Sequence, residues 1–187
     1  MVSLQTPVCD FGTKARDFSL PGVDQQLWTL DKCRGERGLL VMFISNHCPY
    51  VKAIRRKLVR DTRELILLGI NSVAIMPNDT VAYPEDSQAN MLLVSQEFEF
   101  PFPYLLDETQ EVARDYGAIC TPDFFGYNAN MELQYRGRLD AAGPKSEEDG
   151  FTRELYEAMK LVAETGRGPE KQVPSMGCSI KWRETSV

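Results

Sequence analysis

The chain has 187 residues, of which 43% are hydrophobic, and this predicts a single globular domain spanning residues 1–187. Its 27 acidic residues outnumber its 21 lysines and arginines, and the net charge of −6 disfavours nucleic acids and anionic membrane surfaces as partners. No apolar run approaches the length of a membrane span, and Met1–Pro7 lacks the basic and apolar regions of a secretory signal. Five cysteines are too few and too scattered for a disulfide scaffold, so we expect a cytoplasmic protein in a reducing compartment.

The first 37 residues predict an extension of the core that contains a β-hairpin. Short apolar segments at 18–20 and 27–30 are separated by a Pro-Gly pair and a polar Asp-Gln-Gln run, which is typical of two strands and a turn. Cys9 and Cys33 fall in this region. Neither lies at a recognisable helix start among cationic residues, so we expect both thiols to be structural.

A strand, a turn and a helix start meet at Cys48. Leu39–Ile44 is a short continuous apolar run, which predicts a central strand covered on both faces. Pro49 suits the first position of a helix, where its nitrogen needs no hydrogen-bond partner. From Val51 onward apolar residues recur every three or four positions, as on one face of a helix. Cys48 is therefore expected at the amino end of a helix that follows a central strand.

This position favours a reactive thiolate at Cys48. The amino end of a helix carries about half a positive charge and unpaired N–H groups, and both stabilise a thiolate. His47, the only histidine, directly precedes the cysteine, and Lys52 and Arg55 follow within two helical turns. We expect Cys48 to have the lowest pKa of the five thiols, below the free value of about 8.5, and to act as a nucleophile. The alternative is a small buried apolar residue, as many free cysteines are.

The segments after this helix predict a parallel crossover followed by a long excursion. The helix is expected to end near Leu68, with Gly69 in the left-handed position that closes many helices. The apolar run Ile70–Met76 then predicts a strand, and strand–helix–strand at this spacing implies a right-handed parallel unit. A second helix is expected from Pro84 to near Phe98, where acidic residues at its start suit the helix dipole.

The rest of the chain predicts shorter elements and one further helix. We expect a strand at 104–106, a short helix begun by a capping box of Asp107 and Gln110, and a hairpin of 124–127 with 132–138. The inward side chains expected on the two helices are Met91, Leu92 and Val94, and then Phe151, Leu155, Ala158, Met159 and Val162. A tail at 166–187 follows the core at 38–165. No phosphate loop or zinc-spaced cysteine set is present, so we expect neither a metal nor a cofactor.

Several motifs make the chain similar to a known family. Phe43, followed after four residues by Cys48 and Pro49, resembles the active-site entry of the thioredoxin superfamily. Asn46–Val51 resembles the peroxiredoxin-like branch of the AhpC/TSA group, and the likeness continues through 83–87, 102–105, 120–125, 135–137 and 177–182. The resemblance implies an α/β thioredoxin fold, a mixed central sheet flanked by helices, with an N-terminal β-hairpin extension, a peroxiredoxin-like insertion and a C-terminal tail.

The same resemblance implies where a substrate binds. In the thioredoxin fold a cis-proline opens a strand and faces the active-site cysteine, so the bond between Thr121 and Pro122 is expected to be cis and to lie against Cys48. The residue before this proline offers its backbone to an extended substrate. We therefore expect Asn46, Pro49, Thr121 and Pro122 to contact the substrate.

The chain departs from better-known relatives at residues that complete their reaction cycles. A dithiol thioredoxin has a second cysteine three residues after the first, and a peroxiredoxin has its peroxidatic cysteine at that same position. In this chain the position is occupied by Val51. The buried acid expected six residues before the first cysteine is Met42. Ser45 matches the hydroxyl that a peroxiredoxin has three residues before its cysteine, but the proline expected at Val41 is missing.

We interpret the chain as a thiol–disulfide oxidoreductase that contributes to redox homeostasis. We expect Cys48 to attack the substrate and His47 partly to replace the missing base; the alternative is that His47 is a surface side chain that only tunes the local electric field. The expected partners are a protein or small-molecule disulfide, or a hydroperoxide, and an external thiol reductant. Two alternatives stay open: a thiol peroxidase of the peroxiredoxin type, and a redox-silent module that binds peptides in the same groove.

A single attacking cysteine needs a second thiol to release the mixed disulfide, and we expect Cys178 to supply it. This residue lies in an ordered-looking island, 176–182, of an otherwise polar tail, which is long enough to reach Cys48. Cys120 is a secondary candidate, but its side chain should point away from the groove that Thr121 faces. The alternative is that Ile180 and its neighbours only cover an apolar patch, and that the cysteine in this island is incidental.

Overall fold

The computed structural model describes residues 2–142 and 150–184 and has a five-stranded sheet at its centre. The strand order is β6-β5-β4-β8-β9, and the strands are Tyr104–Leu106, Ile70–Met76, Gly38–Phe43, Asp123–Asn128 and Leu133–Tyr135. β4 and β5 are parallel, as are β5 and β6, whereas β8 is antiparallel to β4 and to β9. β4 is therefore the central strand of a mixed sheet, as the sequence predicted.

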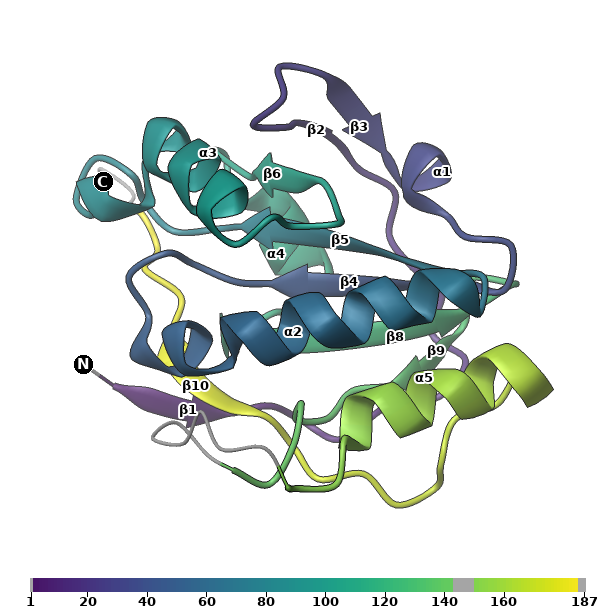
Figure 1. The fold of residues 1–187 in the computed structure, drawn as a ribbon. Helices are drawn as coiled ribbons and strands as arrows, with labels where there is room; N and C mark the ends of the chain where they lie inside the picture. Colours follow the sequence, from purple (N-terminus) through teal and green to yellow (C-terminus); the bar gives the residue numbers. More distant parts are fainter. Residues whose placement is uncertain (1, 143–149, 185–187) are drawn as a thin grey trace.

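Helices cover both faces of this sheet (Figure 1). α2 (Pro49–Leu67) and α5 (Glu154–Thr165) lie side by side in front of the sheet in the figure, and α4 (Glu111–Asp115) lies behind it. A 3-10 turn, η1 (Pro84–Asp86), precedes α3 (Gln88–Glu97), which packs near β6. Across residues 2–142 and 150–184, no helix combines the length and the apolar character that crossing a membrane requires.

β4 is apolar at every position because both of its faces are covered. Alternate residues of a strand point to opposite faces of the sheet. Leu40 and Met42 pack in one cluster with side chains of α2 and α5. Leu39, Val41 and Phe43 pack in another, with side chains of the N-terminal segment and of the region around α4. The sheet thus separates two hydrophobic cores.

A second, three-stranded sheet brings the two ends of the chain together. It consists of β1 (Ser3–Gln5), β10 (Met176–Ser179) and β7 (Cys120–Thr121), in that order and all antiparallel. β7 continues through Pro122 into β8, so this sheet is attached to the central one. In Figure 1 the yellow strand β10 lies near the amino end of α2. The tail island is therefore docked, as predicted, whereas β1 was not expected because only pairing with the tail makes it a strand.

The N-terminal hairpin forms where the sequence predicted it. β2 (Ser19–Pro21) and β3 (Leu27–Thr29) pair antiparallel, and the short helix α1 (Leu30–Cys33) follows. The backbone N–H of Val23, in the turn, donates to the carbonyl of Tyr104 in β6 (3.0 Å). The hairpin therefore extends the outer edge of the central sheet, as the family resemblance implied.

Two predictions about helix faces are wrong. Leu92 is 37% exposed, and Met91 is the buried side chain of α3, because this helix lies at the periphery with most of its surface in solvent. Phe151 precedes α5 and is 41% exposed, whereas Leu155, Ala158, Met159 and Val162 of that helix are buried as expected.

The predicted capping box is also wrong. The carboxylate of Asp107 accepts from the backbone N–H of Ala113 (2.8 Å), beyond the position that a capping box uses. The side-chain amide of Gln110 donates to the carbonyls of Pro77 (2.6 Å) and Lys181 (2.9 Å). Gln110 therefore attaches the docked tail to the body, a role that depends on a segment 71 residues away.

The packing of α2 predicts different costs for two leucines of this helix. Leu58 is fully buried, whereas Leu67 is 85% exposed. We expect Leu58→Ala to lower the free energy of unfolding by about 2–5 kcal/mol, because it removes buried methyl groups and leaves a cavity. Leu67→Ala removes the same atoms from an exposed side chain, and we expect a change within about 0.5 kcal/mol. Urea unfolding followed by circular dichroism measures both, and equal losses would contradict this packing.

Candidate functional site

Cys48 lies at the amino end of α2, as the sequence predicted. It is the N-cap residue, with φ −62° and ψ 121°, and Pro49 takes the first helical position. Its carbonyl accepts the first hydrogen bond of the helix, from the N–H of Lys52 (2.9 Å). Cys48 is fully buried. The unpaired N–H groups and the positive end of the helix dipole therefore lie beside a cysteine that is screened from water.

Within the described residues, two polar groups lie against the Cys48 sulfur. Sγ lies 3.0 Å from the carbonyl oxygen of Thr121, to which the thiol donates, and 2.9 Å from Sγ of Cys178. No disulfide joins these two cysteines, so the second distance is a non-covalent contact between two thiols. The bond between Thr121 and Pro122 is cis, the isomer that the resemblance implied. Cys48 thus meets segments that are 73 and 130 residues away in the sequence.

Ser45 joins the end of β4 to the same loop. Its hydroxyl lies 3.1 Å from the hydroxyl of Thr121, and both side chains are buried. Among the contacts of the described residues, none joins the Ser45 hydroxyl to the Cys48 sulfur. Ser45 therefore helps to hold the Thr121 carbonyl in place rather than contacting the sulfur itself.

Strand register explains why Cys178, and not Cys120, meets Cys48. In the pairing of β10 with β7, Cys178 lies opposite Thr121, and Ser179 lies opposite Cys120. Directly opposite residues share a face of the sheet, and consecutive residues alternate between faces. Cys178 therefore lies on the face of Thr121 and Cys48, whereas the Cys120 side chain points to the other face, as predicted from the alternation.

Burial raises the pKa of the four other thiols. It raises the pKa of Cys9 to about 11 and that of Cys33 to about 12. Burial, and then the charge of Asp123, raises the pKa of Cys120. Burial, the hydrogen bond with Cys48 and the charge of Cys48 raise the pKa of Cys178 to about 12. These four thiols are therefore protonated at neutral pH, in agreement with a structural role for Cys9 and Cys33.

His47 faces a carboxylate in this structure. Its Nδ1 lies 2.7 Å from Oδ2 of Asp86, and its ring is stacked on Tyr83 with the centroids 5.4 Å apart and the planes at 9°. No contact of the described residues joins the His47 ring to the Cys48 sulfur. The geometry therefore gives the imidazole a positioning role, and a role as a base toward the sulfur stays a prediction.

Asp86 holds the active-site turn and was not identified from the sequence. Its fully buried carboxylate accepts from the backbone N–H groups of Asn46 (2.8 Å) and His47 (3.2 Å) and from the side-chain amide of Asn78 (2.8 Å). Burial alone would raise the pKa of this carboxyl. The hydrogen bonds from His47 and Asn78 and the attraction of His47 outweigh burial and hold the pKa below its ordinary value.

The sequence contained one signal that could have found Asp86. We interpreted it as an acidic residue in the first turn of a helix, where it would suit the dipole. However, β4 and β5 are parallel, so the segments that follow them lie at the same edge of the sheet. An aspartate in the loop after Ile70–Met76 was therefore a candidate neighbour of the turn that contains Cys48.

Arg55 and Asn46 complete the support of this turn. The Arg55 guanidinium donates a short hydrogen bond to the Asn46 carbonyl and lies 5.2 Å from the centre of the Phe98 ring. Burial lowers the pKa of Arg55, while the neighbouring groups, Cys48 among them, oppose that shift. The Asn46 side chain donates to the carbonyl of Glu85 (3.1 Å) and accepts from the Tyr104 hydroxyl (3.1 Å). These bonds occupy the Asn46 amide, and its predicted contact with a substrate stays a prediction.

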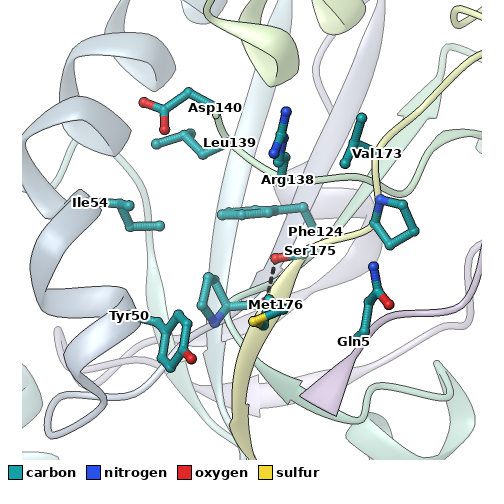
Figure 2. A pocket seen from close by; sticks show the side chains of 12 residues that line it. Gln5, Tyr50, Ile54, Phe124, Arg138, Leu139, Asp140, Val173, Ser175 and Met176 are labelled. Atoms are coloured by element: carbon teal, nitrogen blue, oxygen red, sulfur yellow. Dashed lines mark hydrogen bonds between the residues drawn. The ribbon is translucent and has the colours of Figure 1, made fainter. Parts of the chain in front are cut away.

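A cavity of about 290 Å³ adjoins the site (Figure 2). Its walls come from α2, from the strand that follows the cis-proline and from the tail; among the lining residues are Tyr50, Ile54, Pro122, Phe124, Ser175 and Met176. Figure 2 shows Tyr50 and Ile54 on one side and Val173 and Gln5 on the other, with Met176 between them. At the rim, the Arg138 guanidinium pairs with the Glu154 carboxylate (2.7 Å). The cavity is therefore mainly apolar, and its one arginine is paired with a carboxylate.

Comparisons with known proteins agree with this architecture. Residues 11–141 match the model of the AhpC/TSA family. The chain is similar to an uncharacterized conserved protein from Geobacillus kaustophilus, at 40% identity and a TM-score of 0.93, over 100% of this chain and 99% of that chain. It is also similar to a hypothetical protein from Sinorhizobium meliloti, at 39% identity and a TM-score of 0.91, over 97% and 99% of the two chains.

At lower identity the likeness concerns the fold alone. A thiol:disulfide interchange protein of the thioredoxin family from Chlorobium tepidum is 18% identical, with a TM-score of 0.61 over 81% of this chain and 97% of that chain. This agrees with the α/β thioredoxin fold that the sequence predicted. No curated protein matches the chain.

The bonds of Asp86 predict a pH-dependent contribution to stability. Because its pKa is lowered in the folded protein, the stabilisation is present above the unfolded pKa of about 3.9 and is lost as the pH falls through the folded value. We expect Asp86→Asn to lower the free energy of unfolding by about 1.5–3 kcal/mol at pH 7, and by less at pH 3. Urea unfolding at both pH values measures this, with Glu85→Gln, at an exposed neighbour, as the control. An equal loss at pH 3 and pH 7 would contradict the charged role of Asp86.

Proposed function

The chain belongs to the AhpC/TSA family and has the thioredoxin fold, and from this we propose that it is a thiol–disulfide oxidoreductase whose nucleophile is Cys48. The observation that carries the proposal is the contact of 2.9 Å between the sulfur atoms of Cys48 and Cys178, next to the carbonyl of Thr121. A pair of thiols at this distance needs little movement to become a disulfide.

In the first step the Cys48 thiolate attacks one sulfur of a substrate disulfide. A new bond joins Cys48 to that sulfur, the substrate S–S bond breaks, and the other half leaves as a thiolate. The amino end of α2 and the buried guanidinium of Arg55 both favour negative charge at the attacking sulfur. Asp86 and His47 position the turn that presents the cysteine, and act through the backbone rather than on the substrate.

In the second step Cys178 attacks the Cys48 sulfur and releases the bound half of the substrate as a second thiolate. Burial, the hydrogen bond with Cys48 and the charge of Cys48 hold the pKa of Cys178 near 12 in the dithiol state. Once Cys48 is part of a mixed disulfide, it has neither the thiol nor the charge. The two causes that involve Cys48 then disappear, and Cys178 loses its proton more readily.

The cycle closes with an external thiol reductant. The Cys48–Cys178 disulfide has given two electrons to the substrate and must receive two from a donor of the dithiol class before the next turnover. No residue discussed above supplies these electrons. We therefore place the reductant among the partners of this protein.

A thiol peroxidase is the second candidate, since peroxiredoxins share this family. Efficient peroxide reduction needs a hydroxyl and an arginine at the attacking sulfur. The Ser45 hydroxyl bonds to Thr121, and the Arg138 guanidinium bonds to Glu154, so neither group contacts Cys48 in the described residues. Arg55 supplies positive charge near the sulfur, but no hydroxyl of the described residues accompanies it there. We therefore rank disulfide exchange first. A redox-silent peptide-binding module is the third candidate, and the reactivity of the Cys48 thiol distinguishes it from both enzymes.

The pairing of the two thiols predicts a defined oxidation product. We expect mild oxidation of the intact protein, followed by proteolysis and mass mapping, to yield a peptide pair that joins Cys48 to Cys178. Cys178→Ser should instead accumulate mixed disulfides on Cys48, because the resolving thiol is missing. Cys120→Ser is the matched control, since it removes a neighbouring buried thiol on the opposite face and should leave the product unchanged. A Cys48–Cys120 product, or none, would reject Cys178 as the resolving residue.

The surroundings of Cys48 also predict slow peroxide turnover. With hydrogen peroxide and a dithiol donor, we expect consumption well below that of disulfide reduction under the same conditions. The comparison uses the intact protein and the Cys48→Ser variant as the blank. Rapid, saturable peroxide reduction that disappears in Cys48→Ser would reverse the ranking of the two enzymatic functions.

A further inference from the structure

β10 lies in a slot between β1 and β7 that fits one extended strand. Cys178 pairs with Ser3 on one side and with Thr121 on the other, so the strand is bonded along both edges. This register presents one side chain of the strand to the Cys48 sulfur, at 2.9 Å. Because backbone pairing sets the register, any strand that pairs in this way and has a cysteine opposite Thr121 places that sulfur next to Cys48.

The residue that precedes the cysteine of a strand in this slot must be glycine. A Cβ added to Gly177 would lie 2.2 Å from the carbonyl oxygen of Thr121, 2.5 Å from its carbonyl carbon and 2.9 Å from the nitrogen of Pro122. These atoms belong to the backbone that holds the strand, so they cannot move aside as a flexible side chain does. Close approach of two backbones is therefore what requires glycine here.

The residue two positions before the cysteine directs its side chain into the apolar cavity. Met176 lies on the same face of β10 as Cys178, about 7 Å along the strand. It is half exposed and lines the cavity together with Tyr50 and Phe124 (Figure 2). An apolar side chain at this position gains contacts that a charged one would not.

We propose that this slot recognises an extended segment of a partner protein with the pattern apolar–Gly–Cys, whose cysteine is part of a disulfide. The chain's own Met176–Ser179 is the resident occupant, and such a segment displaces it. This inference rests on the proposed disulfide exchange at Cys48. It adds the sequence pattern that the substrate must have before its cysteine, and it adds competition between substrate and tail, because the slot holds one strand at a time.

The reaction then follows occupancy of the slot. With the partner segment bound, the Cys48 thiolate bonds to the partner's cysteine sulfur, and the other half of the partner disulfide leaves as a thiolate. When the tail returns, Cys178 attacks the Cys48 sulfur and the partner's cysteine leaves as a thiolate. An external dithiol then reduces the Cys48–Cys178 bond, so two electrons pass from the dithiol to the partner.

The test uses the full chain with Cys178→Ser, in which the mixed disulfide on Cys48 accumulates. Two capped peptides, Ser-Met-Gly-Cys-Ser and Ser-Met-Ala-Cys-Ser, carry a 2-thiopyridyl group on the cysteine sulfur. Attack by Cys48 releases 2-thiopyridone, whose absorbance gives the rate, and Cys48→Ser supplies the blank. Adding Gly177→Val introduces the clash with Thr121 and removes the resident strand from the slot.

We expect Gly177→Val to increase the rate of reaction with the glycine peptide by about tenfold. We also expect the glycine peptide to react about tenfold faster than the alanine peptide, because a tenfold difference corresponds to the loss of about one hydrogen bond when a clashing strand fails to pair. Lys171→Val, at an exposed position before the slot, is the matched control and should change neither rate. If Gly177→Val does not fold, the ratio of the two peptides in Cys178→Ser alone decides.

A small disulfide separates failure of this inference from failure of the proposed function. 2,2′-Dipyridyl disulfide needs no strand pairing, so its reaction reports only whether Cys48 exchanges disulfides. Reaction of Cys48 with this reagent together with equal rates for the two peptides would overturn the slot. No reaction of Cys48 with it in any variant would overturn both the proposed function and the inference.

Discussion

The site depends on the close approach of three backbones at the amino end of α2. The Thr121 carbonyl accepts from the Cys48 thiol, and the same carbonyl lies so near Gly177 that a Cβ there would be 2.2 Å from its oxygen. This approach fixes the register of β10 against β7. A shift of the tail by one residue would turn every side chain to the other face and move the Cys178 sulfur away from Cys48. The geometry of the two thiols is therefore a consequence of backbone packing, and the cysteine side chains follow it.

Charge around the turn is balanced by groups from different parts of the chain. Burying the Asp86 carboxylate costs free energy, and this cost is offset because N–H groups of the turn, His47 and Asn78 all donate hydrogen bonds to it. On the other side, the buried guanidinium of Arg55 donates to the carbonyl of Asn46. The negative and positive groups thus fix the turn from two directions. A turn held in this way can present the sulfur of the proposed nucleophile without moving when charge develops on it.

In the proposed exchange, the full burial of Cys48 makes its reaction depend on the tail. Among the described residues the sulfur contacts the Thr121 carbonyl and Cys178 of β10, so in the proposed exchange a large partner reaches it only after the tail leaves the slot. The tail is held beyond the slot as well, where Gln110 bonds to the carbonyl of Lys181. The similarity to the Geobacillus kaustophilus protein covers 100% of this chain, so the likeness between the two proteins includes the tail.

Local sequence determined the elements that carry their own signals. The apolar run of β4, Pro49 after Cys48 and the left-handed Gly69 predicted the strand, the helix start and the helix end, because each depends on neighbouring residues alone. The family motifs added the cis bond before Pro122 and the fold. The sequence favoured Cys178 over Cys120 as the neighbour of Cys48 but left an incidental cysteine open, and only the tertiary structure showed the contact. Only the tertiary structure showed that Asp86 supports the turn rather than a helix dipole. Both outcomes depend on strand register and on loops from distant segments that meet at one edge of the sheet. The spacing of residues along the chain does not determine how close such segments come in space.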